Sequence, residues 1–147
     1  MPLVIGLLTV VAGVLTTVQS GANAALNKAL GQPVLVAFVV VAANLAVYLA
    51  SIPVLGIGWP AQERFAQAPW WAWIGGVFGG LYVLAAVLFA ERLGAALFTG
   101  LVVTAGIVTS IALDHFGLVG FERHAAGVGR IAGGALMIGG LILVSLT

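Results

Sequence analysis

Five long apolar runs constrain the fold of this 147-residue chain more than any other feature. Each run is roughly 20 residues long, which is the length that a helix needs to cross a hydrocarbon core of about 30 Å. Only 6% of the residues are charged, whereas a soluble domain carries about a quarter charged residues. Because backbone groups in lipid must be hydrogen bonded within the chain, such runs fold as helices. We therefore expect an all-α integral membrane protein.

The predicted spans form a single transmembrane domain over residues 1–147. Their approximate bounds are 3–30, 34–55, 70–90, 94–113 and 128–146. The connections are short except for residues 115–127, so each helix is expected to lie beside its neighbour in sequence. Four tryptophans around the second loop are expected to anchor the chain at the headgroup level, namely Trp59, Trp70, Trp71 and Trp73. The expected location is the cytoplasmic membrane, crossed several times.

The basic residues give the chain almost no preferred orientation. Counting crossings from the N-terminus places Arg64, Arg123 and Arg130 on one side of the membrane, and Lys28 and Arg92 on the other. Lysine and arginine in short loops normally fix the topology of a membrane protein. A ratio of three to two leaves two interpretations: another feature orients the chain, or copies insert both ways round. We favour the second.

Composition argues against several classes of function. The chain has no cysteine and only two histidines, both near the predicted surface, so a nucleophile with its base, or a metal set, is hard to assemble. The net charge is +1 and there is no basic tract, which argues against a nucleic-acid partner. We expect neither an enzyme nor a bound cofactor or metal.

Polar side chains recur along the apolar helices at spacings of three and four residues, which places them on one stripe of each helix. The stripe in the first span carries Gln19, Asn23 and Asn27, with Thr16 and Ser20 beside it. The candidate substrate-binding residues are Gln19, Asn23, Asn27, Asn44, Tyr48 and Ser110. Interhelical hydrogen bonds in membranes average only about 0.6 kcal/mol. The stripes therefore indicate a solvated or substrate-lined cavity, and plain packing between helices is the alternative.

Asp114 and Arg130 occupy the unfavourable ends of their helices. Asp114 lies at the C-terminal end of the fourth span and Arg130 in the first turn of the fifth, where the helix dipole repels each charge. Both lie on the same side of the membrane, so mutual pairing would explain both positions. The pair would act as a structural clamp or as part of a gate. His115 either joins this group or ends the helix.

Glycines in the third and fifth spans are spaced for close helix packing. Small residues four apart let helix backbones approach each other in lipid. The predicted packing residues are Gly75, Gly76, Gly79, Gly80, Gly133, Gly134 and Gly140. Packing within the chain suffices for the third span. The fifth span carries small residues on more than one side, so we expect it also to contact a second subunit.

No carboxylate lies in the middle of a predicted span. Exchange of a cation for a proton normally needs an acid within the membrane. The sequence therefore favours transport of a neutral polar or anionic compound over efflux of lipophilic cations.

Several motifs resemble those of a five-helix bacterial family in the drug/metabolite transporter superfamily, long catalogued as a domain of unknown function. They are Gly13, Gln19, Asn23 and Leu26 in the first span, "WWAWIGG" at the start of the third, "LGAA" at the start of the fourth, and "SIALDHFGLVG" with Arg130 beyond it. The resemblance covers nearly the whole chain. It implies half of an inverted-repeat, ten-helix transporter plan, and hence an antiparallel dimer.

These observations together predict a secondary transporter of a small polar solute, with or without a coupling ion. Two copies in opposite orientation would enclose a cavity in the middle of the membrane and expose it to each side in turn. A non-transporting membrane subunit, or one half of a heteromeric transporter, is the alternative.

Overall fold

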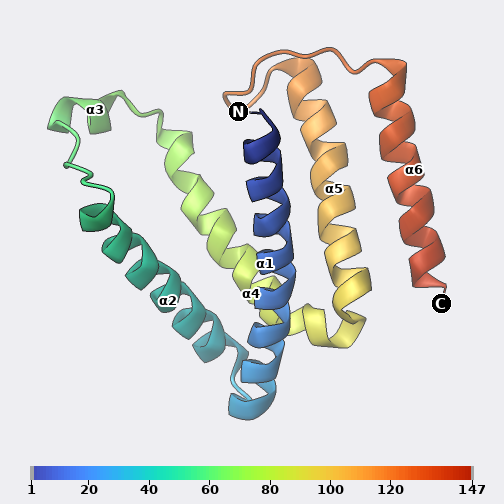
Figure 1. Cartoon of the computed structure of the whole chain (residues 1–147), viewed down its shortest axis with the longest axis horizontal. Coiled ribbons are helices and arrows are strands. Elements are labelled where there is room, and N and C mark those ends of the chain that lie inside the picture. The colour runs from blue at the N-terminus through green and yellow to red at the C-terminus, as the bar shows by residue number, and fades with distance from the viewer. Residues whose placement is uncertain (1, 147) are drawn as a thin grey trace. The chain divides into compact units, whose positions relative to one another are not determined.

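The computed structural model describes residues 2–146, and they are almost entirely helical (Figure 1). The elements are α1 (Pro2–Leu30), α2 (Pro33–Val54), the short α3 (Gln62–Gln67), the 3-10 turn η1 (Trp70–Trp73), α4 (Ile74–Leu93), α5 (Ala95–Phe116) and α6 (Val128–Ser145). No strand occurs among residues 2–146. Five segments are long and apolar enough to cross a membrane. The prediction of an all-α membrane protein with five spans is confirmed.

The third and fourth spans extend beyond their predicted ends, and two glycines determine where they stop. α4 continues past Glu91 and Arg92 to Leu93 and is followed by Gly94, whose φ is 80°. α5 continues past Leu113 to Phe116 and ends at Gly117, whose φ is 64°. Both φ values lie in the left-handed region, which glycine adopts without strain and which ends a helix. Charged residues mark the approach to a helix end, whereas backbone geometry marks the end itself.

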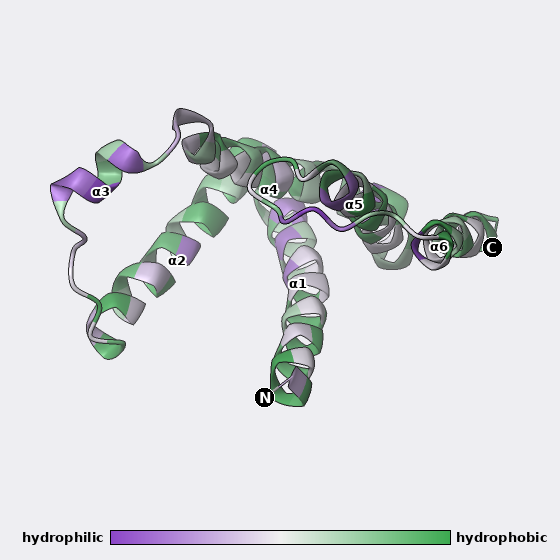
Figure 2. Cartoon of the chain, turned by 90° about the horizontal axis from the view of Figure 1, so that it is seen from above, coloured by the Kyte–Doolittle hydropathy of each residue, from purple (hydrophilic) through white to green (hydrophobic). Residues whose placement is uncertain are grey.

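The chain divides into two compact units, Met1–Arg92 and Leu93–Thr147. In the first unit, α1 and α2 lie close together at the loop that joins them and diverge toward their other ends (Figures 1 and 2). Val36 and Val40 of α2 form a small core with Val87 of α4, against which Leu26 and Val83 pack. This core holds the three helices together at one end and leaves space between them further along.

The second unit consists of α5 and α6, which lie side by side (Figure 1). A Cβ atom added at Gly134 would lie 3.4 Å from the Ile111 Cδ1 atom, an ordinary contact distance. At Gly100 the same atom would lie 2.8 Å from the Leu141 Cδ1 atom. Glycine at position 100 therefore lets the two helices approach closely, as expected for packing in lipid.

Most residues of the long helices are apolar, as the green of the ribbon shows (Figure 2). Large side chains such as Leu8, Val14 and Phe38 are exposed along the spans. Between α2 and α4, α3 places Phe65 against Trp73, with ring centroids 6.2 Å apart and nearly parallel planes. Aromatic residues of this kind are enriched at membrane interfaces. The surface thus matches lipid along the spans and headgroups at this connection.

Candidate transport cavity

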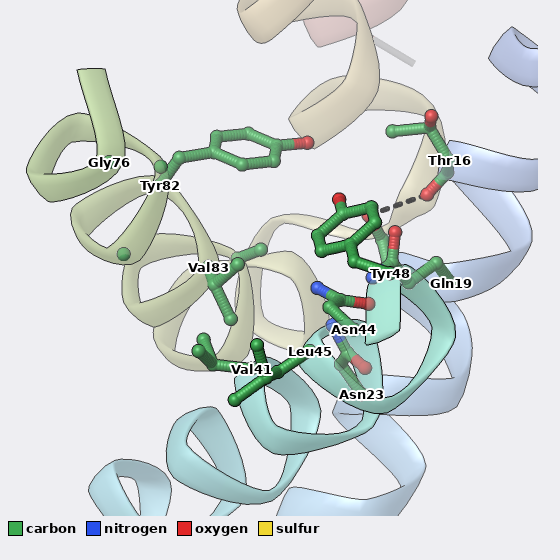
Figure 3. A pocket seen from close by; sticks show the side chains of 14 residues that line it. Thr16, Gln19, Asn23, Val41, Asn44, Leu45, Tyr48, Gly76, Tyr82 and Val83 are labelled. Atoms are coloured by element: carbon green, nitrogen blue, oxygen red, sulfur yellow. Dashed lines mark hydrogen bonds between the residues drawn. The ribbon is translucent and has the colours of Figure 1, made fainter. Parts of the chain in front are cut away.

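A cavity of about 560 Å³ lies between α1, α2 and α4, entirely within the first unit (Figure 3). Fourteen residues line it, and none is charged. They are Thr16, Gln19, Ser20 and Asn23 of α1, Val41, Asn44, Leu45 and Tyr48 of α2, and Gly76, Gly79, Gly80, Tyr82, Val83 and Ala86 of α4. The volume falls within the range of about 300–1,000 Å³ that is typical of small-molecule sites.

One wall of the cavity is polar and comes from α1 and α2. The spacing of Thr16, Gln19 and Asn23 places them on one side of α1, and that of Asn44 and Tyr48 places them on one side of α2. The amides of Asn23 and Asn44 point into the cavity (Figure 3). These stripes thus turn toward each other at the place where the two helices diverge.

The hydroxyl groups of Thr16 and Ser20 are satisfied by their own helix, whereas the amides of this wall are not. The Thr16 hydroxyl donates to the Ala12 carbonyl over 2.8 Å, and the Ser20 hydroxyl donates to the Thr16 carbonyl over 3.1 Å. Within residues 2–146, no hydrogen bond is made by the side-chain amide of Gln19, Asn23 or Asn44. Asn23 is nevertheless only 7% exposed. Gln19 is exposed and Asn44 is half-buried, and among residues 2–146 the only side-chain polar atom that is fully buried without a partner is the Asn27 Oδ1 atom. The amides of the wall are therefore free to bind a solute.

The opposite wall is a glycine face on α4. Gly76, Gly79 and Gly80 line the cavity, and a Cβ atom added at any of them would meet nothing within 4 Å. Sequence reasoning placed these glycines in helix packing, but in the protomer their free side borders the cavity. Gly75 is not among the lining residues, and a Cβ atom there would also meet nothing within 4 Å.

Tyr82 lines the cavity from α4, and sequence reasoning missed it. It lies two residues after the second glycine doublet in "GGVFGGLY". Its ring extends from α4 toward the polar wall (Figure 3). A tyrosine one helical turn beyond a glycine face would have been the signal in the sequence.

Asn27 and Ser110 are not among the residues that line this cavity. The Asn27 Nδ2 atom donates to the Val87 carbonyl of α4 over 3.4 Å, and its Oδ1 atom is buried with no partner among residues 2–146. Asn27 therefore links two helices, as in the alternative interpretation of the polar stripe. Ser110 is an exposed residue of α5, in the second unit.

The second unit contains the ion pair expected from the sequence. The Arg130 Nη1 atom lies 3.1 Å from the Asp114 Oδ2 atom, and the two side chains are 43% and 29% exposed. The pair joins the end of α5 to the first turn of α6, across the loop of residues 117–127. A single contact between partly exposed groups contributes little to stability, about 0–1 kcal/mol.

His115 organises that loop rather than contacting Arg130. Its Nδ1 atom accepts a hydrogen bond of 3.0 Å from the Ala126 backbone, and its carbonyl accepts one from the Arg123 Nε atom. The His124 backbone also donates to the Asp114 carbonyl over 2.8 Å. The loop is thus tied to the end of α5 at several points, close to the ion pair.

The family of the chain follows from comparison with known sequences. The sequence model of a family described as "Putative inner membrane exporter, YdcZ" matches residues 4–143. The chain belongs to this family. None of the curated proteins and none of the solved structures compared matches the chain.

Membership of the family, together with the five apolar spans, identifies a multi-pass protein of the inner membrane. The description of the family supports a transporter role and not an enzymatic one. The lining of the cavity between α1, α2 and α4 offers hydrogen bonding, stacking and apolar contact.

Proposed function

We propose that the protein exports a small neutral polar solute from the cytoplasm through the cavity between α1, α2 and α4. The observation that carries the proposal is the set of amides without partners, Gln19, Asn23 and Asn44, on the wall of a cavity that has no charged lining residue. Amides in hydrocarbon are costly, so their presence needs a compensating interaction. A solute that hydrogen bonds to them supplies it.

The proposal includes an antiparallel dimer that works by alternating access. Inverted repeats around a site in the middle of the membrane are a common transporter plan, and a five-span chain supplies one such half. Gly133 and Gly140 support a contact between subunits through α6, because a Cβ atom added at either would meet nothing within 4 Å, whereas the neighbouring Gly134 packs against α5. The Asp114–Arg130 pair would act as a structural clamp or as part of a gate.

Export is tested in cells that overproduce the chain, by mass spectrometry of the growth medium. We expect the wild type to release at least one solute that Gln19→Leu and Asn23→Leu do not release. Thr9→Val is the matched control, since Thr9 lies on α1 away from the cavity and bonds to the Ile5 carbonyl of its own helix. If both leucine variants release the same solutes as the wild type, the amide wall has no part in transport and the proposal fails.

The dimer is tested by cysteine crosslinking in membranes. Gly133 lies five residues after the first residue of α6, and Gly140 lies five residues before the last. An antiparallel contact between two α6 helices therefore sets Gly133 opposite Gly140 of the partner subunit. The double variant Gly133→Cys/Gly140→Cys should form a crosslinked dimer, whereas each single variant should not, because like positions are about 10 Å apart along the axis at 1.5 Å per residue.

Crosslinking of Gly133→Cys alone would instead indicate parallel subunits. No product from any of the three variants would remove α6 from the interface. Reporter fusions at the C-terminus provide an independent check, and activity on only one side of the membrane would exclude insertion in both orientations.

A further inference from the structure

We propose that the cavity recognises a flat, neutral solute that carries a hydrogen-bond donor and an acceptor side by side on one edge. Primary amides, lactams, ureas and amino-substituted heterocycles belong to this class. The inference rests on the proposed function, because it names the chemistry of the solute that the same cavity would export.

The amides of the polar wall determine the hydrogen-bonding chemistry. Each of Gln19, Asn23 and Asn44 offers an NH2 donor and a carbonyl acceptor from the same planar group. Asn23 is only 7% exposed, lines the cavity and has no side-chain partner within residues 2–146. A planar amide satisfies both its donor and its acceptor when it pairs with an edge that presents the same two groups, as asparagine and glutamine do with adenine.

The absence of charge from the lining makes close binding of ionic cargo unfavourable. None of the fourteen lining residues is acidic, basic or a histidine. A cation would therefore find no carboxylate and an anion no guanidinium or ammonium group, and an unpaired charge in a low-dielectric site is strongly unfavourable. The hydroxyls of Thr16 and Ser20 are already bonded to their own helix, which leaves the amides and the hydroxyls of Tyr48 and Tyr82 as the polar contacts.

The glycine wall determines the shape of the solute. Glycine in a helix costs up to about 1 kcal/mol relative to alanine, yet Gly76, Gly79 and Gly80 have room for a Cβ atom that the chain does not use. Their shared side of α4 presents bare backbone, against which a ring can lie flat. Tyr48 and Tyr82 line the same cavity and offer aromatic faces to such a ring.

Binding of paired probes to the purified full-length chain in nanodiscs tests the inference. Nicotinamide and uracil carry the adjacent donor and acceptor, whereas methyl nicotinate and 1,3-dimethyluracil keep the ring but lack the N–H groups. 1-Methylnicotinamide adds a positive charge to the first ring. We expect the two neutral N–H probes, nicotinamide and uracil, to raise the melting temperature of the chain. We expect each of them to bind at least tenfold more tightly than the other three compounds.

Variants assign that binding to the cavity. Asn23→Leu should weaken nicotinamide and uracil at least tenfold, Asn23→Gln should restore part of the loss, and Thr9→Val should bind like the wild type. Asn44→Leu takes the place of Asn23→Leu if the latter does not fold. Gly79→Leu should weaken both probes while leaving the polar wall intact, because its side chain would occupy the flat wall.

Three results would overturn the inference: neither N–H probe binds, the probes without N–H groups bind equally well, or the cation binds best. Mass spectrometry of the growth medium separates failure of this inference from failure of the proposed function. If the chain exports a solute without a donor–acceptor edge, recognition is refuted and export stands. If the probes bind at Asn23 but no solute differs in the medium, export is refuted and recognition stands.

Discussion

Asn27 provides the sharpest test of the assignment of roles along the α1 stripe. It carries the same side chain as Asn23 one helical turn away, but it lies outside the cavity and contacts the Val87 carbonyl of α4. Its Oδ1 atom is buried and has no partner among residues 2–146. Asn27→Leu replaces this amide with an apolar side chain of similar size. If Asn27 only links helices, any effect of the change should be on stability, and export should be unaffected.

The expected change in stability follows from two opposing contributions. Interhelical hydrogen bonds in membranes average about 0.6 kcal/mol, and the Asn27–Val87 bond, at 3.4 Å, is long. Val87 lies inside α4, so its carbonyl keeps its helical hydrogen bond after the change. Removal of the buried, unsatisfied Oδ1 atom is worth about 1–3 kcal/mol. We therefore expect Asn27→Leu to be neutral or to stabilise the protein by up to about 2 kcal/mol.

Reversible unfolding of the purified chain in bicelles measures this difference. Asn27→Ala serves as the control for volume: it removes the same polar atoms but leaves a cavity, so it should be less stable than Asn27→Leu by about 1 kcal/mol or more. A loss of more than about 1 kcal/mol in Asn27→Leu itself would refute the reasoning. It would mean that the Oδ1 atom has a partner, such as a water molecule or a group of a second subunit.

Three further predictions concern other parts of the chain. Gly79→Leu should abolish export without loss of stability, since Gly79 lines the cavity and a Cβ atom added there meets nothing within 4 Å. Melting curves measure the stability, and analysis of the growth medium measures the export. A double-mutant cycle with Asp114→Asn and Arg130→Gln should give a coupling energy of about 0.2–1 kcal/mol, and a value above about 2 kcal/mol would indicate a buried pair. His115→Ala removes the acceptor for Ala126 and should speed hydrogen exchange across residues 117–127.

The sequence predicted the helices because their signal is local. The length of each apolar run and the residues that flank it suffice to place a span. The polar stripes were also predictable, since helical periodicity alone places Gln19 and Asn23 on one side of α1. The ion pair was predictable because two opposite charges lay at the unfavourable ends of consecutive helices, on the same side of the membrane.

The roles of individual residues on a stripe could not be predicted, because they depend on which helix lies opposite. Asn23 and Asn27 are equivalent in the periodicity of α1. Only the divergence of α2 from α1 sets one beside a cavity and the other beside Val87 of α4. The same holds for Gly76 and Gly79: a pair of small residues at this spacing predicts a close approach, but the sequence does not tell whether a helix or a solute makes it.

The cavity links the chemistry of the cargo to assembly of the protein. Gln19 and Tyr48 line it and are also exposed, so in a bilayer the amide wall would face hydrocarbon unless water, a solute or other helices covered it. An unsatisfied polar group in that setting costs several kcal/mol, which is more than interhelical hydrogen bonds return. The wall is therefore stable in the membrane only when water, a solute or another protomer lies against it. We infer that leucine at positions 19, 23 and 44 together would weaken any dimer that closes over this cavity, whereas leucine at position 27 would leave it unchanged.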